Sequence, residues 1–358
     1  MSQEKAFLVP VDLIRTVAIL GVLLLHAAND LTAQQMNSFE IYRWTVVDVY
    51  QSLGRTGVPL FVMLTGALLL QPSKVNEPIR VFLQKRWARI GLPVLFWGAI
   101  YFAWGFFVDH QTLTSSSIIQ GILTGPSFQF WYIYMLVGLY LLTPVLRIVV
   151  AHADQNIMKY FVTLWILGVG IVPFISLLTT FHLDSNVLTI TGFVGYYILG
   201  LYLLSVQMRR STLLIFMSLG LILTSIGTYA MAATIGGGQM YFFQEYLSPT
   251  LILASVMLFL LLNTIQSPSN PTEKKPKVNS HPKFNKLLSV ISENTLPIFL
   301  LHVIVLECLQ QGYFGFTING NTINSIIGVP LATAITLFIC LAIIVPLKRV
   351  PVLKRLLG

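Results

Sequence analysis

The chain has 358 residues, of which 55% are hydrophobic and only 10% are charged, and its mean hydropathy is +0.77. Soluble domains carry about 25% charged residues, so this composition excludes a soluble protein and predicts an all-α polytopic membrane protein. The net charge is +9, but no compact basic domain exists that could bind nucleic acid. The two cysteines lie in separate apolar segments without metal-ligand spacing, so we expect no metal site.

Ten apolar segments are long enough to cross a membrane as helices, and they predict a single transmembrane domain over residues 1–358. Their expected bounds are 9–29, 47–70, 88–108, 129–150, 158–179, 187–206, 212–235, 247–265, 288–311 and 325–347. A short amphipathic helix is expected around residues 117–123. Residues 267–286 are polar and basic and begin with several prolines, which is typical of a flexible cytosolic linker. Contact of this linker with anionic lipid headgroups is the alternative.

Two ionisable residues, Arg15 and His26, lie inside the first apolar segment. Ionisable groups inside a membrane are costly, so they usually face a polar interior. A separation of eleven residues corresponds to three helical turns plus about 20°, which places both side chains on one face, about 16 Å apart along the axis. His26 is therefore a candidate general base or nucleophile. The alternative is a buried polar pair that only holds helices together.

Asp30 lies one helical turn beyond His26. Its carboxylate could orient the imidazole of His26, as a carboxylate does in a catalytic triad. It could equally be a solvated residue at the outer surface. The sequence leaves these two interpretations open.

The distribution of basic residues predicts the orientation of the helices. If the N-terminus is cytosolic, only Arg43 and Arg55 of the 22 Lys and Arg residues fall on the outer side, which leaves 20 on the cytosolic side. Loops rich in Lys and Arg normally stay in the cytosol. The pattern therefore predicts an even number of spans with both termini cytosolic.

Cysteine labelling tests this orientation. A cysteine placed at Asn319 should react with a membrane-impermeant reagent added outside the cell, because the connection around it contains no basic residue. A cysteine placed at Lys275, within the basic linker, should not react. The reverse pattern would contradict the orientation and the cytosolic donor site that depends on it.

Arg86 and Arg89 stand three residues apart, on one face at the expected cytosolic end of the third helix. A guanidinium pairs with a phosphate through two parallel hydrogen bonds, so the two residues could clamp a phosphorylated cytosolic ligand. With Arg15 at a comparable depth, three arginines would suit an anionic donor such as coenzyme A. The alternative is ordinary positive charge on a cytosolic loop.

Three further residues are candidates for substrate binding. Arg55 lies on the outer side in an apolar stretch whose Gly57 and Pro59 predict close helix contact and a locally broken helix. Trp131 begins the fourth helix, where it could belong to an interfacial aromatic belt or provide a platform for a sugar ring. His302 lies near the middle of the ninth helix and is either a satisfied interior histidine or a site residue.

Several of these motifs, in this order, resemble one known family. The stretch VDLIRTVAILGVLLLH resembles its opening helix, with an arginine, ten residues and a histidine. GVPLFVMLTGALLL resembles its second-helix signature with Thr65 in place of the usual serine, and RWAR resembles its Arg-x-x-Arg motif. WYIYMLVGLYLLTPVL and LPIFLLH resemble later signatures, with Phe299 where tyrosine is commoner. The chain thus resembles integral-membrane acyltransferase family three, which O-acetylates bacterial envelope polysaccharides.

The likeness is greatest to stand-alone members that modify enterobacterial common antigen or intercellular adhesin. It implies a multi-pass enzyme of the bacterial plasma membrane that uses cytosolic acyl-CoA, usually acetyl-CoA. The acceptor would be a hydroxyl of a cell-envelope polysaccharide or lipid-linked glycan at the outer side. The resemblance implies a catalytic role for His26 and donor binding by Arg15, Arg86 and Arg89. A multi-pass transporter or flippase for an envelope glycolipid, using the same Arg and His as an ion relay, is the alternative, and a homo-oligomer remains open.

Overall fold

The computed structural model describes residues 10–28, 41–178, 192–234, 237–266, 282–318 and 322–358. Within these ranges every regular element is a helix, and eight helical stretches are long and apolar enough to cross a membrane. Five of them are single helices: α1 (Val11–Ala28), α4 (Ile79–Phe107), α6 (Phe130–His152), α11 (Arg210–Thr234) and α15 (Ser325–Leu347). Two are interrupted: α2 and α3 (Ile41–Gly54 and Gly57–Leu69) form one span, and α7, η3 and α8 (Gln155–Ile166, Leu167–Ile171 and Val172–Leu178) form another. The last is α12 (Pro249–Gln266) with the turn before it. The prediction of an all-α polytopic membrane protein is confirmed.

The two remaining expected spans take other forms in the described residues. The ninth is a bent pair, α13 (Pro282–Glu293) and α14 (Thr295–Gln311), whose axes differ by 76°. The sixth contains only the short apolar helix α10 (Gly192–Tyr202), continued by the turn η4 (Leu203–Ser205). The expected amphipathic helix is present as α5 (Ser115–Thr124). The minor elements are η2 (Pro72–Lys74), η5 (Gly237–Gln244) and α16 (Pro351–Leu357).

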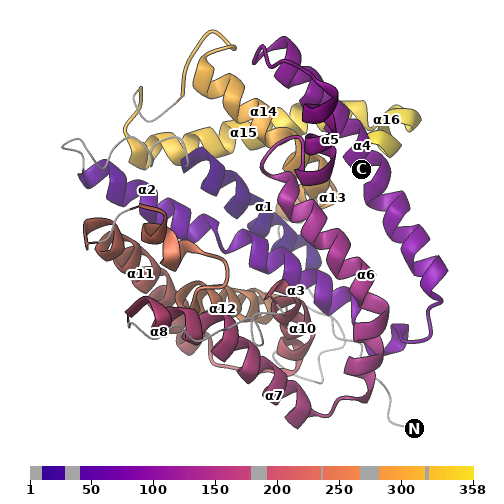
Figure 1. Cartoon of the computed structure of the whole chain (residues 1–358), viewed down its shortest axis with the longest axis vertical. Helices are drawn as coiled ribbons and strands as arrows, with labels where there is room; N and C mark the ends of the chain where they lie inside the picture. Colours follow the sequence, from indigo (N-terminus) through magenta and orange to yellow (C-terminus); the bar gives the residue numbers. More distant parts are fainter. Residues whose placement is uncertain (1–9, 29–40, 179–191, 235–236, 267–281, 319–321) are drawn as a thin grey trace.

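Helix α1 lies inside the bundle, where it contacts α2, α3, α13, α14 and α15 (Figure 1). The predicted break in the second span occurs between Gly54 and Gly57, where α2 ends and α3 begins. Glycine is needed at both positions because a Cβ on Gly54 would lie 2.7 Å from the backbone nitrogen of Leu25, and one on Gly57 would lie 2.5 Å from the carbonyl oxygen of Ala18. Small residues thus bring α1 into backbone contact with the broken span.

Helix α4 begins at Ile79, about two and a half turns earlier than expected. Pro78 precedes its first residue and the helix then runs for 29 residues, of which the first three turns contain the basic residues. Lys and Arg are good helix formers, so the basic residues that precede the apolar segment belong to the helix. The apolar pattern alone therefore predicted a start that was too late. At 1.5 Å per residue the helix is about 44 Å long, which exceeds the roughly 30 Å hydrocarbon core. Arg86 and Arg89 consequently lie within the helix rather than at its start.

The bend between α13 and α14 also differs from the straight helix expected over residues 288–311. Asn294 separates the two helices with φ −111° and ψ 12°, and Pro297 lies in the first turn of α14. Proline cannot continue the hydrogen bonding of a preceding helix, but it is tolerated in a first turn. Of the expected linker, residues 267–281 lie outside the described residues, and residues 282–286 begin α13.

Candidate functional site

A cavity of about 330 Å³ lies between α1, α3, α4, α6 and α14. Its polar lining residues are Arg15, Thr65, Lys74, Arg86, Arg89, Tyr132, Tyr140 and Thr295. None of the described residues that line it is acidic. The structure thus brings together the three arginines that the sequence analysis grouped, and it adds a fourth cation. We refer to this space as the cationic cavity.

Arg86 is the most enclosed of the arginines on α4 in this cavity. Its Cζ atom lies 5.5 Å from the ring centroid of Phe82 and 5.8 Å from that of Tyr140. Its Nε atom is buried and has no hydrogen-bond partner. A buried guanidinium nitrogen without an acceptor favours binding of an anion, because an unpaired buried polar group is costly. The cavity is therefore suited to a ligand that carries several negative charges.

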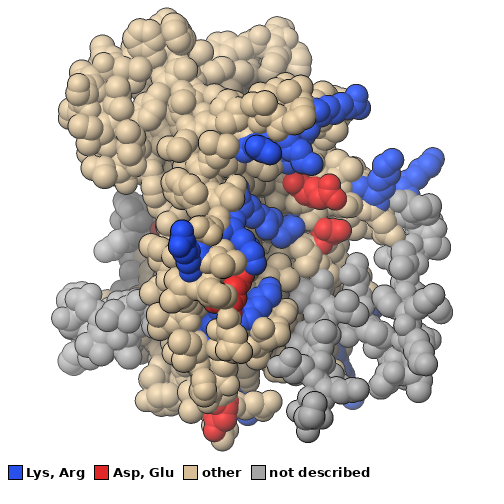
Figure 2. Space-filling view, turned by 90° about the vertical axis from the view of Figure 1, so that its right-hand side faces the viewer, with Lys and Arg blue, Asp and Glu red and all other residues tan. Residues whose placement is uncertain are grey.

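Basic side chains also gather on the outside of the molecule next to this region. Figure 2 shows a face on which Lys and Arg side chains gather among few acidic ones, while the upper part of the same view shows only uncharged residues. An anionic ligand that approaches this face would be attracted by the local positive potential.

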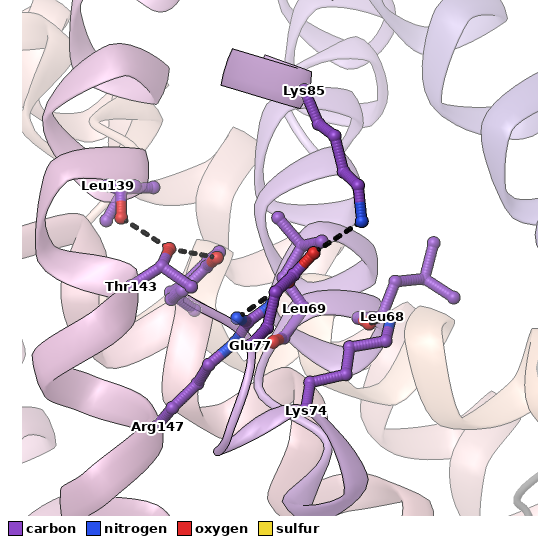
Figure 3. A network of polar contacts seen from close by, with 9 residues as sticks. Leu68, Leu69, Lys74, Glu77, Lys85, Leu139, Thr143 and Arg147 are labelled. Atoms are coloured by element: carbon purple, nitrogen blue, oxygen red, sulfur yellow. Dashed lines mark hydrogen bonds and ion pairs between the residues drawn. The ribbon is translucent and has the colours of Figure 1, made fainter. Parts of the chain in front are cut away.

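The segment that carries Lys74 is held in place by one acidic residue, Glu77 (Figure 3). Glu77 accepts hydrogen bonds from Arg147 Nη1 at 2.9 Å and from Lys85 Nζ at 2.7 Å. Arg147 is buried, and its Nε donates to the carbonyl oxygen of Leu69 at 2.7 Å. Contact with Lys85, and then with Arg147, holds the pKa of the Glu77 carboxyl below its usual range. The carboxylate therefore stays ionised and fixes the connection between α3 and α4.

Lys74 itself extends back along the end of α3, where its Nζ donates to the carbonyl oxygen of Leu68 (Figure 3). Burial lowers the pKa of Lys74, and the neighbouring charges of Arg147 and Arg86 lower it further. A negative ligand in the cavity would reverse this effect and stabilise the ammonium. The sequence analysis counted Lys74 only as a cytosolic charge, because nothing in its local sequence distinguishes it from other basic loop residues.

His26 lines a small pocket beyond the cationic cavity. This pocket and the cationic cavity share Tyr132 and Phe299 as wall residues. Arg15 and His26 therefore line two adjoining spaces from one helix, as their spacing predicted. The two positions at which the sequence departs from the family pattern, Thr65 and Phe299, both line the cationic cavity.

A second cavity, of about 480 Å³, lies on the other side of the His26 pocket. The pocket of His26 shares Trp131 and Tyr246 with it, so the three spaces follow one another. The second cavity also contains Phe193, Phe242 and Glu245. Four of its nine lining residues are aromatic and one carries a carboxylate, and we call it the aromatic cavity.

The other sequence candidates lie around His26 but differ in their surroundings. Arg55 lies with its Cζ 5.5 Å from the ring centroid of Tyr246, which lines the aromatic cavity, but Arg55 is not itself among the lining residues. Trp131 lines that cavity and the His26 pocket. His302 is fully buried, and its ring centroid lies 5.1 Å from that of His26. It is not among the lining residues of the three spaces. Asp30 lies outside the described residues.

A comparison with known proteins identifies the family of this chain. A family model described as an acyltransferase domain matches residues 9–345. No curated protein and no solved structure matches the chain. The matched range includes every described residue of the three spaces. Because the match covers nearly the whole chain, this protein belongs to acyltransferase family 3 and is a membrane acyltransferase.

Proposed function

We propose that this acyltransferase takes an acetyl group from cytosolic acetyl-CoA and transfers it to a hydroxyl of an envelope polysaccharide or lipid-linked glycan at the outer side of a bacterial plasma membrane. The observation that carries this proposal is the order of the spaces. The cationic cavity lies at one end, His26 in the middle and the aromatic cavity at the other end. An acyl-CoA donor has the matching order of chemical groups, with phosphates at one end and the thioester at the other.

The donor side is argued from charge and length. Coenzyme A carries its negative charge on a diphosphate and a 3′-phosphate, and Arg15, Lys74, Arg86 and Arg89 offer four cations without an acidic lining residue. Arg15 lies about 16 Å from His26 along α1, so the two side chains would contact different parts of the donor. The extended pantetheine arm would cover this distance and bring the thioester to the imidazole. No metal ion is required by this arrangement.

Two chemical routes are open at His26. In the first, the imidazole takes the proton of the acceptor hydroxyl while its oxygen attacks the thioester carbonyl, the C–S bond breaks, and the proton passes to the leaving thiolate. In the second, an imidazole nitrogen attacks the carbonyl, the C–S bond breaks and the thiolate leaves; the hydroxyl oxygen then attacks the acyl carbon, its proton passes to the thiolate, and the C–N bond breaks to return the neutral imidazole. Both routes use a neutral imidazole with one free lone pair.

The acceptor side rests on the aromatic cavity. The faces of sugar rings are apolar and pack against aromatic side chains, which Trp131, Phe193 and Tyr246 provide. Glu245 adds a carboxylate at its wall for hydrogen bonding to hydroxyl groups, and the guanidinium of Arg55 lies against the ring of Tyr246. In this proposal Arg55 and Trp131 bind the acceptor.

Thioester cleavage by the purified protein tests the proposal against the transporter alternative. With acetyl-CoA and an extract of envelope glycans, the wild-type protein should release free coenzyme A and transfer the acetyl group to the glycan. A transporter or flippase would bind or move its ligand and leave the thioester intact. Binding of acetyl-CoA without any thioester cleavage in the presence of acceptor would contradict the proposal.

Lys74 provides a prediction that the sequence alone did not offer. Lys74→Ala should weaken acetyl-CoA binding about tenfold, because it removes one charge-assisted contact from a half-buried position. Isothermal titration with acetyl-CoA measures the change. Lys159→Ala is the matched control, since Lys159 is exposed on α7 and does not line the cavity. Equal affinity of the Lys74→Ala variant and the wild type would remove Lys74 from the donor site.

A further inference from the structure

His302 hydrogen-bonds to the backbone of its own helix through one ring nitrogen, and its other ring nitrogen has no partner. Its Nδ1 atom lies 2.6 Å from the carbonyl oxygen of Phe299. A carbonyl oxygen can only accept, so Nδ1 carries the proton and donates. In a neutral imidazole the other nitrogen is then an acceptor. That atom, Nε2 of His302, is buried and has no partner.

His26 also has a buried ring nitrogen that lacks a hydrogen-bond partner. Its Nδ1 is also buried without a partner, whereas its Nε2 is not among the buried atoms that lack one. The ring centroids of His26 and His302 are 5.1 Å apart, and the ring planes are inclined by 36°. The two nitrogens are not hydrogen-bonded to each other in the structure, but at this centroid separation two ring nitrogens that faced each other would lie within the usual length of a hydrogen bond. Two unpaired buried nitrogens in adjacent rings are costly, and one shared proton satisfies both.

We propose that His302 is a positioning residue that fixes the tautomer of His26. Its Nε2 accepts a hydrogen bond from Nδ1–H of His26, which leaves Nε2 of His26 with the free lone pair in the pocket between the two cavities. This inference rests on the proposed function, because it assigns the nitrogen that acts on the acceptor hydroxyl or the thioester. It replaces the expectation that His302 binds substrate.

The arrangement also explains how the charge on His26 is tolerated during the reaction. When Nε2 of His26 takes a proton, the resulting imidazolium still donates through Nδ1 to a neutral acceptor. In a catalytic triad a carboxylate has this role, holding the tautomer and stabilising the imidazolium. A second imidazole provides the same orientation without placing an additional buried anion inside the membrane.

Two substitutions of similar polarity distinguish a role of His302 in positioning His26 from a role in packing alone. His302→Gln places an amide oxygen near the position of Nε2, so it retains the acceptor for His26 and loses the Phe299 contact. His302→Asn retains a donor for Phe299 and has no group at the position of Nε2. We expect His302→Gln to keep most of the kcat, and His302→Asn to lower kcat about tenfold to a hundredfold. The KM for acetyl-CoA should change little in either variant, because His302 does not line the cationic cavity.

The protonation state of His26 gives a second, independent readout. In protein labelled with ¹⁵N-histidine, the resonances of His26 are assigned by their loss in His26→Gln. The wild type and His302→Gln should show His26 protonated at Nδ1, and His302→Asn should show a mixture of tautomers. Thermal unfolding of both His302 variants confirms that they fold.

The outcomes separate this inference from the proposed function. Equal kcat values for the Gln and Asn variants, or an unchanged His26 tautomer in His302→Asn, would overturn the positioning role. A wild-type protein that does not cleave acetyl-CoA would overturn the proposed function, and the ¹⁵N spectra would still decide the hydrogen bond between the two histidines.

Discussion

His26→Ala should abolish acyl transfer and leave donor affinity close to that of the wild type. A sugar hydroxyl is a poor nucleophile at neutral pH, and a positioned base contributes about 10²–10⁴-fold to such a reaction. His26 lies in the pocket between the two cavities and is not part of the cationic cavity. The loss should therefore appear in kcat, measured as thioester cleavage in the presence of acceptor, while the Kd for acetyl-CoA is retained.

His152→Ala is a suitable control for this variant. His152 is exposed near the end of α6, where its Nδ1 lies 2.8 Å from the carbonyl oxygen of Ile148, and it lines none of the three spaces. Its substitution should leave kcat unchanged. Radiolabelled acetyl trapped on the wild type but not on His26→Ala would select the covalent route. Near-normal glycan acetylation in cells expressing His26→Ala would contradict the catalytic assignment.

Arg86→Ala should weaken acetyl-CoA binding more than any other single substitution in the cationic cavity. The Arg86 guanidinium is enclosed by Phe82 and Tyr140 and has a buried nitrogen without a partner, so its contact with a phosphate would be well desolvated. Charge-assisted hydrogen bonds of this kind contribute about 1.5–3 kcal/mol, which corresponds to a roughly tenfold to hundredfold loss of affinity. Arg89 is exposed, and Arg89→Ala should give a loss near the lower end of this range.

Two further variants make the test specific. Arg86→Lys should restore binding only in part, because an ammonium lacks the fork geometry of the guanidinium. Arg80→Ala removes the same charge from an exposed position on the same helix outside the cavity, and we expect its affinity to match the wild type. If Arg86→Ala and Arg89→Ala bind acetyl-CoA as well as Arg80→Ala does, these residues are only the positive charges of a cytosolic helix end.

The parts of the site that follow from local sequence were predictable. The spacing of Arg15 and His26 places them on one face of α1, and both line adjoining spaces. Gly57 and Pro59 predicted the break between α2 and α3. These features depend only on helical periodicity and on residues that neighbour one another in the chain.

Contacts between distant segments were not predictable from periodicity. The approach of His302 to His26 depends on the bend at Asn294, which the apolar pattern of residues 288–311 conceals. The place of Lys74 in the cavity depends on the ion pair of Glu77 with Arg147, two residues far apart in sequence. A single sequence contains no information on which interior residue of one helix meets which residue of another.

Side-specific transfer in membrane vesicles tests the central claim most directly. Inside-out and right-side-out vesicles from cells that make the protein are given radiolabelled acetyl-CoA on their outer surface, with vesicles containing His26→Ala as the control. We expect inside-out vesicles to incorporate label into glycan that is enclosed in the lumen, and right-side-out vesicles to incorporate none. Labelling that requires right-side-out vesicles, or that is equal with His26→Ala, would contradict transfer from a cytosolic donor through His26.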